Sequence, residues 1–254
     1  MTTVESILNF LNTVAPVDLA MDWDNSGFQV GSKTTPISKI LVALDPFEDV
    51  CQEAAQWGAE MIVTHHPLIF HPVKNVTDDT AVGRALMLLL KNGISLWSGH
   101  TNLDVVSGGV NDILANKLGL QDVQILPPDN LLRCGTVTQQ SLADFLARVK
   151  AELGCEGLRY VDCGKPCRKI AVGGGACASE MRSAAEAGCD TFVTADVKYN
   201  QFWDAADCGL NLIDAGHFHT ENPVCSLLCK KLQEAFPDVT VRISESHRDC
   251  MKFF

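Results

Sequence analysis

Apolar and polar residues follow one compound pattern twice in this chain. In its first instance a β-branched apolar run at 40–44 precedes an alanine-rich amphipathic stretch that ends at Gly58, and a second apolar run follows at 61–63. The second instance begins at Ile170 and ends at Val193. Short apolar runs are typical of buried strands, and a glycine often ends a helix. Each instance therefore predicts a strand, a helix and a strand of one parallel sheet.

The two instances align without a gap, because residues 39–64 lie over residues 169–194 at a constant offset of 130 (169 minus 39). Eight of the 26 positions are identical, whereas roughly one or two would match by chance. The identical residues of the first segment are Lys39, Ile40, Val42, Ala54, Ala55, Gly58, Val63 and Thr64. The chain is thus predicted to contain an internal pseudo-repeat.

The segments that follow each instance also correspond. In the first half a helix at about 81–91 leads to a strand at 95–98. In the second half a helix at about 200–206 leads to a strand at 210–214. Parallel strands of one sheet end at a common edge, so polar residues that follow them are predicted to gather there.

The stretch Leu-Pro-Pro-Asp-Asn at 126–130 is the most linker-like segment of the chain. After it, residues 131–161 read as strand, helix and strand, with Ser141 as a good N-cap. We therefore predict an α/β fold of two related domains, 1–127 and 128–254.

Adjacent histidines follow the strand that ends near Thr64, in the order His65, His66, Pro67. Neighbouring residues of a strand point to opposite faces, so both imidazoles reach one site only if the chain leaves the strand there. Pro67 favours such a departure. Taken alone, a His-His pair is more often structural or merely exposed than a ligand.

Two further strands each end in Gly-His with an acid four residues later: His100 with Asp104, and His217 with Glu221. A helical turn after the glycine would bring each histidine and its acid to one side. A single such pair can equally be a helix start with a solvated acid. Equivalent strand ends instead carry five imidazoles and two carboxylates, which are His65, His66, His100, His217, His219, Asp104 and Glu221.

This set predicts a metal site. Imidazole and carboxylate suit Zn²⁺, Mn²⁺, Fe²⁺ or Co²⁺, and the lack of cysteine in these motifs argues against a closed structural zinc site. Five or six protein ligands exceed the three usual for one catalytic ion. They favour two ions, roughly 3.5–4 Å apart, at the interface of the two domains.

Composition narrows the class of protein. The chain has 254 residues, a net charge of −11 and 46% hydrophobic residues, as expected for a globular protein. The negative charge makes nucleic acid an unlikely partner, and no run approaches the roughly 20 apolar residues of a membrane span. The N-terminus lacks an export signal, and the eleven cysteines are an odd number, so we expect reduced thiols and a cytoplasmic location.

Four motifs together resemble the Ngg-one-interacting-factor-three-like family, whose bacterial members are often labelled GTP cyclohydrolase I type two homologs. They are WDNSGFQVG at 23–31, THHP at 64–67, HTNLD at 100–104 and DAGH at 214–217 with Glu221. The likeness covers essentially the whole chain in the short bacterial form.

The resemblance implies a dinuclear centre with the ligands His65, His66, Asp104, His217 and Glu221. It places His100 beside the ligands with a role in proton transfer, and it implies a toroidal homohexamer. His219 is expected outside the ligand set. The chain departs from the pattern at Tyr199-Asn200, where many relatives carry a histidine, so no role is carried over there.

Two further features stay open from the sequence. Asp196 occupies the repeat position of His66, and it could be a vestigial ligand, a partner for an imidazole or a helix cap. The Gly173–Gly175 run could hold an anion, although a plain tight turn is the simpler interpretation.

Two functions fit these residues. The first is a metal-dependent hydrolase in which a metal-bound hydroxide attacks a phosphoester, an amide or a purine ring carbon. The second is a non-catalytic toroidal scaffold that binds metal and acts through protein partners. The sequence names neither the substrate nor the metal, and no element that would read guanine is evident.

Overall fold

The computed structural model of the protein describes all residues from Met1 to Phe254, and these form two compact units. The first unit contains Met1–Val106 and Val224–Arg248. The second contains Ser107–Pro223 and Asp249–Phe254. Each unit has one β-sheet covered by helices, which confirms the predicted α/β fold with two sheets.

The first unit holds a five-stranded sheet in the order β1-β4-β3-β2-β11. Strands β2, β3, β4 and β11 are parallel, and β1 is antiparallel to β4. The elements are α1 (Val4–Val14), η1 (Val17–Leu19), β1 (Gly27–Val30), β2 (Lys39–Ala43), α2 (Glu48–Trp57), β3 (Met61–Thr64), α3 (Ala81–Asn92), β4 (Ser95–Ser98), α4 (Thr101–Val105), α10 (Pro223–Ala235) and β11 (Thr240–Ile243).

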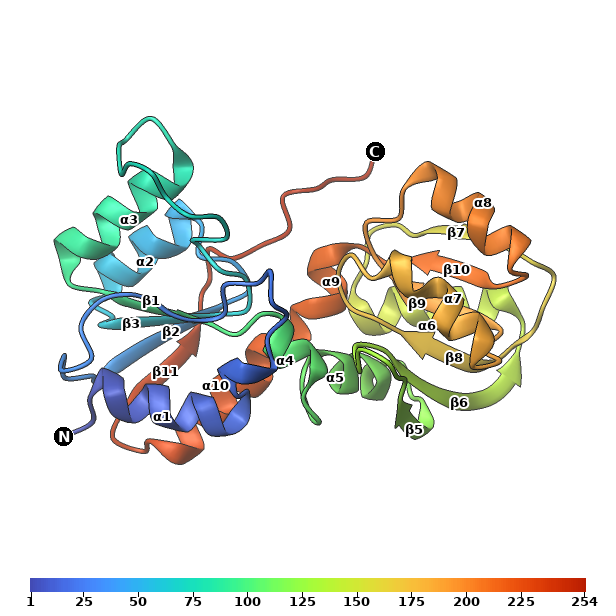
Figure 1. Ribbon diagram of the computed structural model, residues 1–254, viewed down its shortest axis with the longest axis horizontal. Helices are drawn as coiled ribbons and strands as arrows, with labels where there is room; N and C mark the ends of the chain where they lie inside the picture. Colours follow the sequence, from blue (N-terminus) through green and yellow to red (C-terminus); the bar gives the residue numbers. More distant parts are fainter. The chain divides into compact units, whose positions relative to one another are not determined.

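Alternate residues of these strands face two different helical layers. Leu41 and Ile62 pack with Val50 of α2 and Leu86 of α3 in one hydrophobic core. Helices α1 and α10 cover the opposite face of the same sheet (Figure 1). A strand buried on both faces reads as a continuous apolar run, which is the pattern seen at 40–44.

Strand β11 joins this first sheet although it lies near the C-terminus, because Val241 pairs with Ile40 of β2. The compact units consequently differ from the predicted ranges 1–127 and 128–254. The position of a boundary between separately folding domains stays a prediction.

The second unit holds a six-stranded sheet in the order β5-β6-β8-β9-β10-β7. Strands β8, β9 and β10 are parallel, whereas β5, β6 and β7 pair antiparallel. The elements are α5 (Val110–Lys117), β5 (Gln121–Ile125), β6 (Arg133–Gln140), α6 (Leu142–Leu153), β7 (Arg159–Val161), β8 (Cys167–Val172), η2 (Ala178–Glu180), α7 (Met181–Glu186), β9 (Thr191–Thr194), α8 (Tyr199–Asp207), β10 (Asn211–Asp214) and α9 (His217–Glu221).

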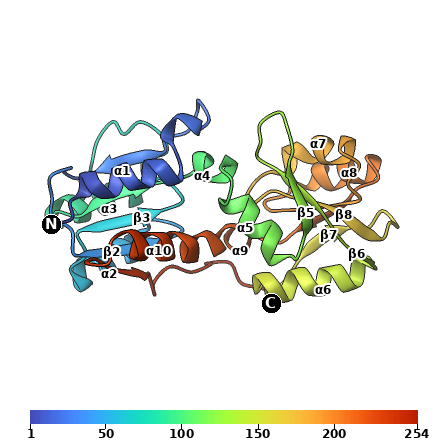
Figure 2. The same cartoon turned by 90° about the horizontal axis from the view of Figure 1, so that it is seen from below.

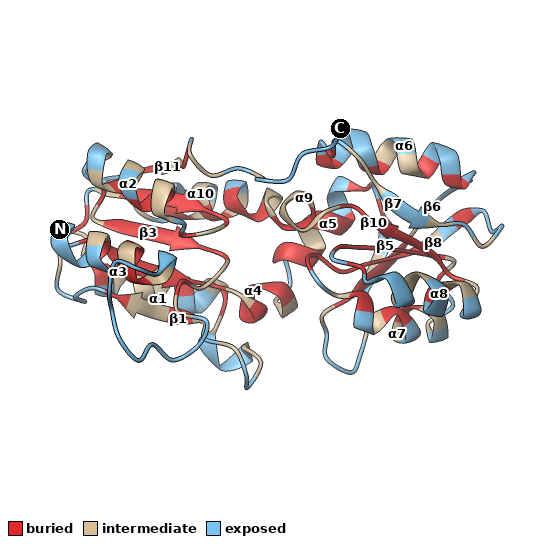
Figure 3. Ribbon diagram, turned by 90° about the horizontal axis from the view of Figure 1, so that it is seen from above, coloured by how far each residue is buried: buried red, intermediate tan, exposed pale blue.

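This second sheet also separates two hydrophobic cores. Phe145 of α6 packs with Val193 and Ile213 on one face, and Met181 of α7 packs with Phe192 on the other. Figure 2 shows α6 on one side of the strands and α7 and α8 on the opposite side. Strands β9 and β10 are buried, whereas the edge strands β5 and β7 and the outer faces of the helices are largely exposed (Figure 3).

The N-terminal helix α1 was not predicted, although the sequence carries its signals. The Thr3 side chain accepts a hydrogen bond from Ser6 N, and the Ser6 side chain accepts one from Thr3 N, which forms a capping box. Val4, Ile7 and Leu11 are the buried residues of the helix and have helical spacing. None of the helices combines the length and the apolar character needed to cross a membrane.

Candidate metal centre

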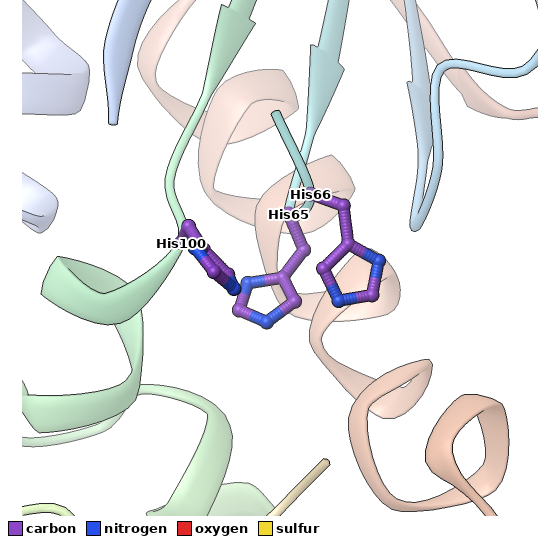
Figure 4. A group of neighbouring side chains, drawn as sticks. All are labelled: His65, His66 and His100. Carbon is purple, nitrogen blue, oxygen red and sulfur yellow. The ribbon is translucent and has the colours of Figure 1, made fainter. Parts of the chain in front are cut away.

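His65 and His66 reach the same side of the first sheet because the chain leaves β3 directly after Thr64. The Thr64 hydroxyl donates to the His66 carbonyl at 2.8 Å, which fixes the turn, and the two ring centroids lie 4.8 Å apart. The expected departure of the chain from the strand before Pro67 is therefore confirmed. Figure 4 shows both imidazoles beside that of His100.

The orientation of His65 is fixed by a backbone carbonyl. Its ring is fully buried, and Nδ1 lies 2.7 Å from the carbonyl oxygen of Gly99. A carbonyl only accepts hydrogen bonds, so Nδ1 carries the proton and donates. In the neutral form, a ring held in this way has its lone pair on Nε2, which is the form that ligates a metal.

His66 is oriented in the same way by a carboxylate. Its Nδ1 donates to Asp45 Oδ1 at 2.7 Å. Asp45 follows strand β2, so it stands at the same edge of the sheet as His66, which follows the neighbouring strand β3. A carboxylate in this position fixes the tautomer and makes the distal nitrogen a better ligand.

His100 donates from Nδ1 to Asp24 Oδ1 at 2.7 Å. The Asp24 side chain is fully buried, and it also accepts hydrogen bonds from Thr101 Oγ1 at 2.6 Å and Ser26 Oγ at 2.7 Å. Burial alone raises the pKa of Asp24, but the hydrogen bonds from His100, Thr101 and Ser26 outweigh it and hold that pKa well below its usual range. Asp24 is thus a carboxylate that fixes His100.

The three imidazoles form one cluster. The ligand atoms of His65, His66 and His100 all lie within 4.8 Å of one another. Asp104 lies on α4, and its Oδ1 is 3.7 Å from His65 Nε2. The first unit therefore brings together the four candidate residues predicted in it.

In the second unit His217 and Glu221 stand one helical turn apart on α9. His217 Nε2 lies 2.9 Å from Glu221 Oε2, and His217 Nδ1 donates to Asp196 Oδ2 at 2.7 Å. Asp196 is thus a partner for an imidazole, one of the three roles left open by the sequence. Asp196 follows strand β9 and accepts from an imidazole, just as Asp45 follows strand β2 and accepts from His66.

His219 does not join this pair. Its Nδ1 donates to the carbonyl of Leu153 at 3.2 Å, and its Nε2 lies 3.4 Å from Asp249. The Gly173–Gly175 run is likewise no free anion cradle. Its three N–H groups donate to groups of the protein, which are Val193 O, Asn111 Oδ1 and Thr220 Oγ1.

Gly175 instead provides space for the pair on α9. It has φ +61°, and a Cβ added there would lie 2.1 Å from Glu221 Oε1 and 3.0 Å from His217 Nε2. Any side chain at this position would push the carboxylate away. The glycine run therefore positions Glu221 and His217.

Sequence reasoning missed the residues that orient the imidazoles in the first unit. Asp24 is 76 residues from His100, and no periodic pattern links them. Asp45 could have been found, because it follows a predicted strand at the edge where His65 and His66 were expected. The common feature is that all four imidazoles are held through Nδ1 by an oxygen of the protein, which is how metal-binding histidines are oriented.

The fold and these residues define a class: an α/β protein with two mixed sheets and a histidine-carboxylate set suited to divalent metal. The sequence profile of the family Duf34/NIF3 (NGG1p interacting factor 3) matches residues 2–250. The chain belongs to this family.

Relatives cover the chain from end to end. The GTP cyclohydrolase 1 type 2 homolog of Clostridium perfringens is 37% identical over 98% of this chain and 99% of its own length. That of Clostridium acetobutylicum is 33% identical over 98% of each chain. A solved Bacillus cereus protein related to NIF3 superposes with a TM-score of 0.94 at 26% identity, covering 100% of this chain and 99% of the other.

Proposed function

We propose that the protein binds two divalent metal ions and uses them as a hydrolase. The proposed ligands are His65, His66 and Asp104 of the first unit with His217 and Glu221 of the second. The observation that carries the proposal is the shared orientation of the imidazoles. A histidine held through Nδ1 by a carboxylate or a carbonyl presents Nε2 as a ready ligand, without a further cost of ordering the ring.

The donor set fits such ions. Imidazole nitrogen and carboxylate oxygen together suit Zn²⁺, Mn²⁺, Fe²⁺ and Co²⁺, and no cysteine thiol lies in either cluster. The side chain of Glu221 is only 5% exposed and that of Asp104 12% exposed. Divalent cations would offset the cost of burying these negative charges. Membership in a family whose curated relatives carry a cyclohydrolase name supports the same function.

Ions held by these residues would supply Lewis-acid chemistry, that is, a water of lowered pKa and stabilisation of negative charge on a substrate oxygen. Residues of the chain would transfer protons and orient the groups that do so. His100 is proposed to transfer a proton to or from the substrate at Nε2. Asp24 holds that ring in one orientation and one tautomer, because its carboxylate accepts from Nδ1.

Metal content tests the ligand set. Purified protein and variants are dialysed equally, and the ions per chain are measured by elemental analysis. His65→Ala should lower the stoichiometry, whereas His71→Ala, which removes an exposed histidine outside the proposed set, should leave it unchanged. Two ions retained by His65→Ala would remove it from the ligand set.

A turnover screen tests the hydrolase. The protein loaded with each candidate ion is offered nucleotides, phosphodiesters and cyclic amides. For any substrate that is hydrolysed, His100→Ala should lower kcat by roughly 10²–10⁴ fold while the metal is retained, as expected for the loss of a general acid or base. Bound metal without turnover of any class, together with reproducible capture of protein partners, would instead favour the scaffold.

We also propose assembly as a homohexamer, which rests on the family resemblance. Sedimentation at micromolar concentration should give a single species of six chains. A monomer under these conditions would contradict the proposal.

A further inference from the structure

A cavity of about 130 Å³ lies in the first unit directly beside His66. Its walls come from the loop that follows β2, from the segment that follows His66, and from one face of α3. The lining is mainly apolar and comprises Pro46, Phe47, Pro67, Leu68, Ala81, Val82 and Ala85, together with Asp45, Glu48 and His66. Apart from His66 and its partner Asp45, the residues of this lining have no role in the proposed metal centre.

The size and the walls of the cavity suit one aromatic ring. An apolar cavity of about 150 Å³ in a protein interior is large enough to bind benzene. Here Phe47 offers a ring that is 61% exposed, and Leu68 and Val82 supply aliphatic surface. A planar ligand would contact the aromatic side chain of Phe47. Because the lining is mainly apolar, the ligand would displace water from few polar groups of the protein.

The charges at the cavity select against anions. Asp45 and Glu48 are the acidic residues of the lining, and no lysine or arginine contributes to it. Asp45 accepts from His66 Nδ1, and Glu48 accepts from Arg84 Nε at 2.8 Å, so both carboxylates are already held. A phosphate or carboxylate placed here would meet the carboxylates of Asp45 and Glu48. The guanidinium of Arg84, which lies outside the lining, is already paired with Glu48.

We propose that this cavity binds an aromatic ring without negative charge, and that the ring belongs to the substrate of the proposed metal centre. The second half of this statement rests on the proposed function. It follows from the position of His66, which is one of the residues that line the cavity. A substrate anchored by its ring in the cavity would hold its reacting group next to that proposed ligand, which lowers the entropic cost of reaction.

The test uses full-length protein freed of metal with a chelator and followed by ¹H–¹⁵N NMR. Benzamidine and benzoate are titrated separately, because they have nearly the same shape and opposite charge. Benzamidine should give saturable shifts centred on the amides of Phe47, Leu68 and Val82. Benzoate should bind at least tenfold more weakly.

Two variants locate the site. Ala81 is exposed on α3 and lines the cavity, so Ala81→Leu should fill its entrance and weaken benzamidine binding at least tenfold. Ala151→Leu is the matched control, because it makes the same change at an exposed position of α6. Phe47→Ala, which removes the aromatic wall from an exposed position, should weaken binding severalfold.

Unsaturable shifts, shifts centred elsewhere, equal binding of benzoate, or wild-type affinity in Ala81→Leu would each overturn the proposal. The titration needs no metal and no turnover. Failure of ring binding therefore leaves the metal centre standing, and failure of metal binding in the separate analysis leaves the result on the ring unaffected.

Discussion

The strand-helix-strand segments of the two units make the same hydrogen bonds between side chains and backbone, but different functional residues follow their strands. Lys39 Nζ donates to the carbonyl of Trp57 at 2.9 Å, and Lys169 Nζ donates to that of Ala187 at 2.6 Å. Glu60 accepts from Lys39 N at 2.8 Å, as Asp190 accepts from Lys169 N at 2.8 Å. Each of these residues of the first unit lies 130 positions before its counterpart in the second unit. Whether the two units superpose as a true repeat stays a prediction.

The chemistry differs at the residues that follow the strands. In the first unit two imidazoles follow β3, and the carboxylate of Asp45 that orients one of them follows β2. In the second unit the carboxylate of Asp196 follows β9, and the imidazole of His217 follows β10. In both units the acid follows one strand and the imidazole it orients follows the next, but the second unit places this pair one strand further along its frame. The chemistry of each unit therefore depends on the residues that follow its strands.

The largest expected effect comes from Glu221→Gln. A carboxylate can bridge two ions, whereas an imidazole nitrogen serves one, and Glu221 is the buried acid of the second unit's pair. We expect both ions to be weakened together, by at least about 100-fold, and Asp104→Asn to spare part of the occupancy. Metal stoichiometry after equal dialysis measures this. Two ions held at unchanged affinity by Glu221→Gln would show that Glu221 is no bridge.

Gly175→Ala should destabilise the second unit more than the same change at an uncrowded glycine of similar φ. The change combines a left-handed backbone with a Cβ only 2.1 Å from Glu221 Oε1, which the carboxylate must move to avoid, so we expect a loss of about 2 kcal/mol in the free energy of unfolding. Gly188→Ala has a similar φ of +77° with no atom within 4 Å, and it should cost only about 1 kcal/mol. Denaturant unfolding compares the two, and equal losses would show that the crowding at Glu221 is relieved without cost.

Replacing the acids that orient the imidazoles should weaken metal binding less than replacing a ligand. The two acids, Asp45 and Asp196, should differ in the size of the effect. Asp45→Asn and Asp196→Asn keep the shape of the side chain, and Asn tolerates the left-handed backbone of Asp196. We expect about tenfold weaker metal binding for Asp45→Asn and a smaller loss for Asp196→Asn, because the Asp196 side chain is 51% exposed against 21% for Asp45. Competition with a chelator gives both affinities, and a reversed order would contradict the role of burial.

The smallest expected effect concerns the acids that anchor the two segments. Burial raises the pKa of Glu60, but hydrogen bonds from the Ser38 hydroxyl and the amides of Lys39 and Ser38 outweigh it and lower the pKa. A lowered pKa in the folded state stabilises the protein above the pKa of the unfolded state, about 4.3, and this stabilisation is lost as the pH falls through the folded value.

Glu60→Gln should therefore cost about 1 kcal/mol at pH 7, and the difference from wild type should shrink below about pH 4. Asp190→Asn, the counterpart in the second unit, should cost a similar amount at pH 7 because it loses the same kind of contacts. Urea unfolding at several pH values measures both. A cost of Glu60→Gln that stayed constant down to pH 3 would show that the carboxylate charge contributes nothing.

The strand-helix-strand segments and the candidate ligands were accessible from the sequence for a local reason. Apolar periodicity and glycine positions act over a few residues, so the ends of β3, β4 and β10 could be predicted within a residue or two. Each Gly-His with an acid four residues later then fell at a strand end, where parallel sheets collect functional groups. His65 and His66 could be placed on one side because Pro67 predicts that the chain leaves the strand before it.

The partners of these residues were decided only by the tertiary structure. The pairing of β11 with β2, the contact of Asp24 with His100 and the approach of Gly175 to Glu221 join segments that lie far apart in the chain. Their formation depends on how whole sheets and helices pack, and no short-range pattern encodes that. The sequence alone thus determined which side chains stand at the strand ends, whereas packing determined which oxygen holds each Nδ1 and so which way each imidazole faces.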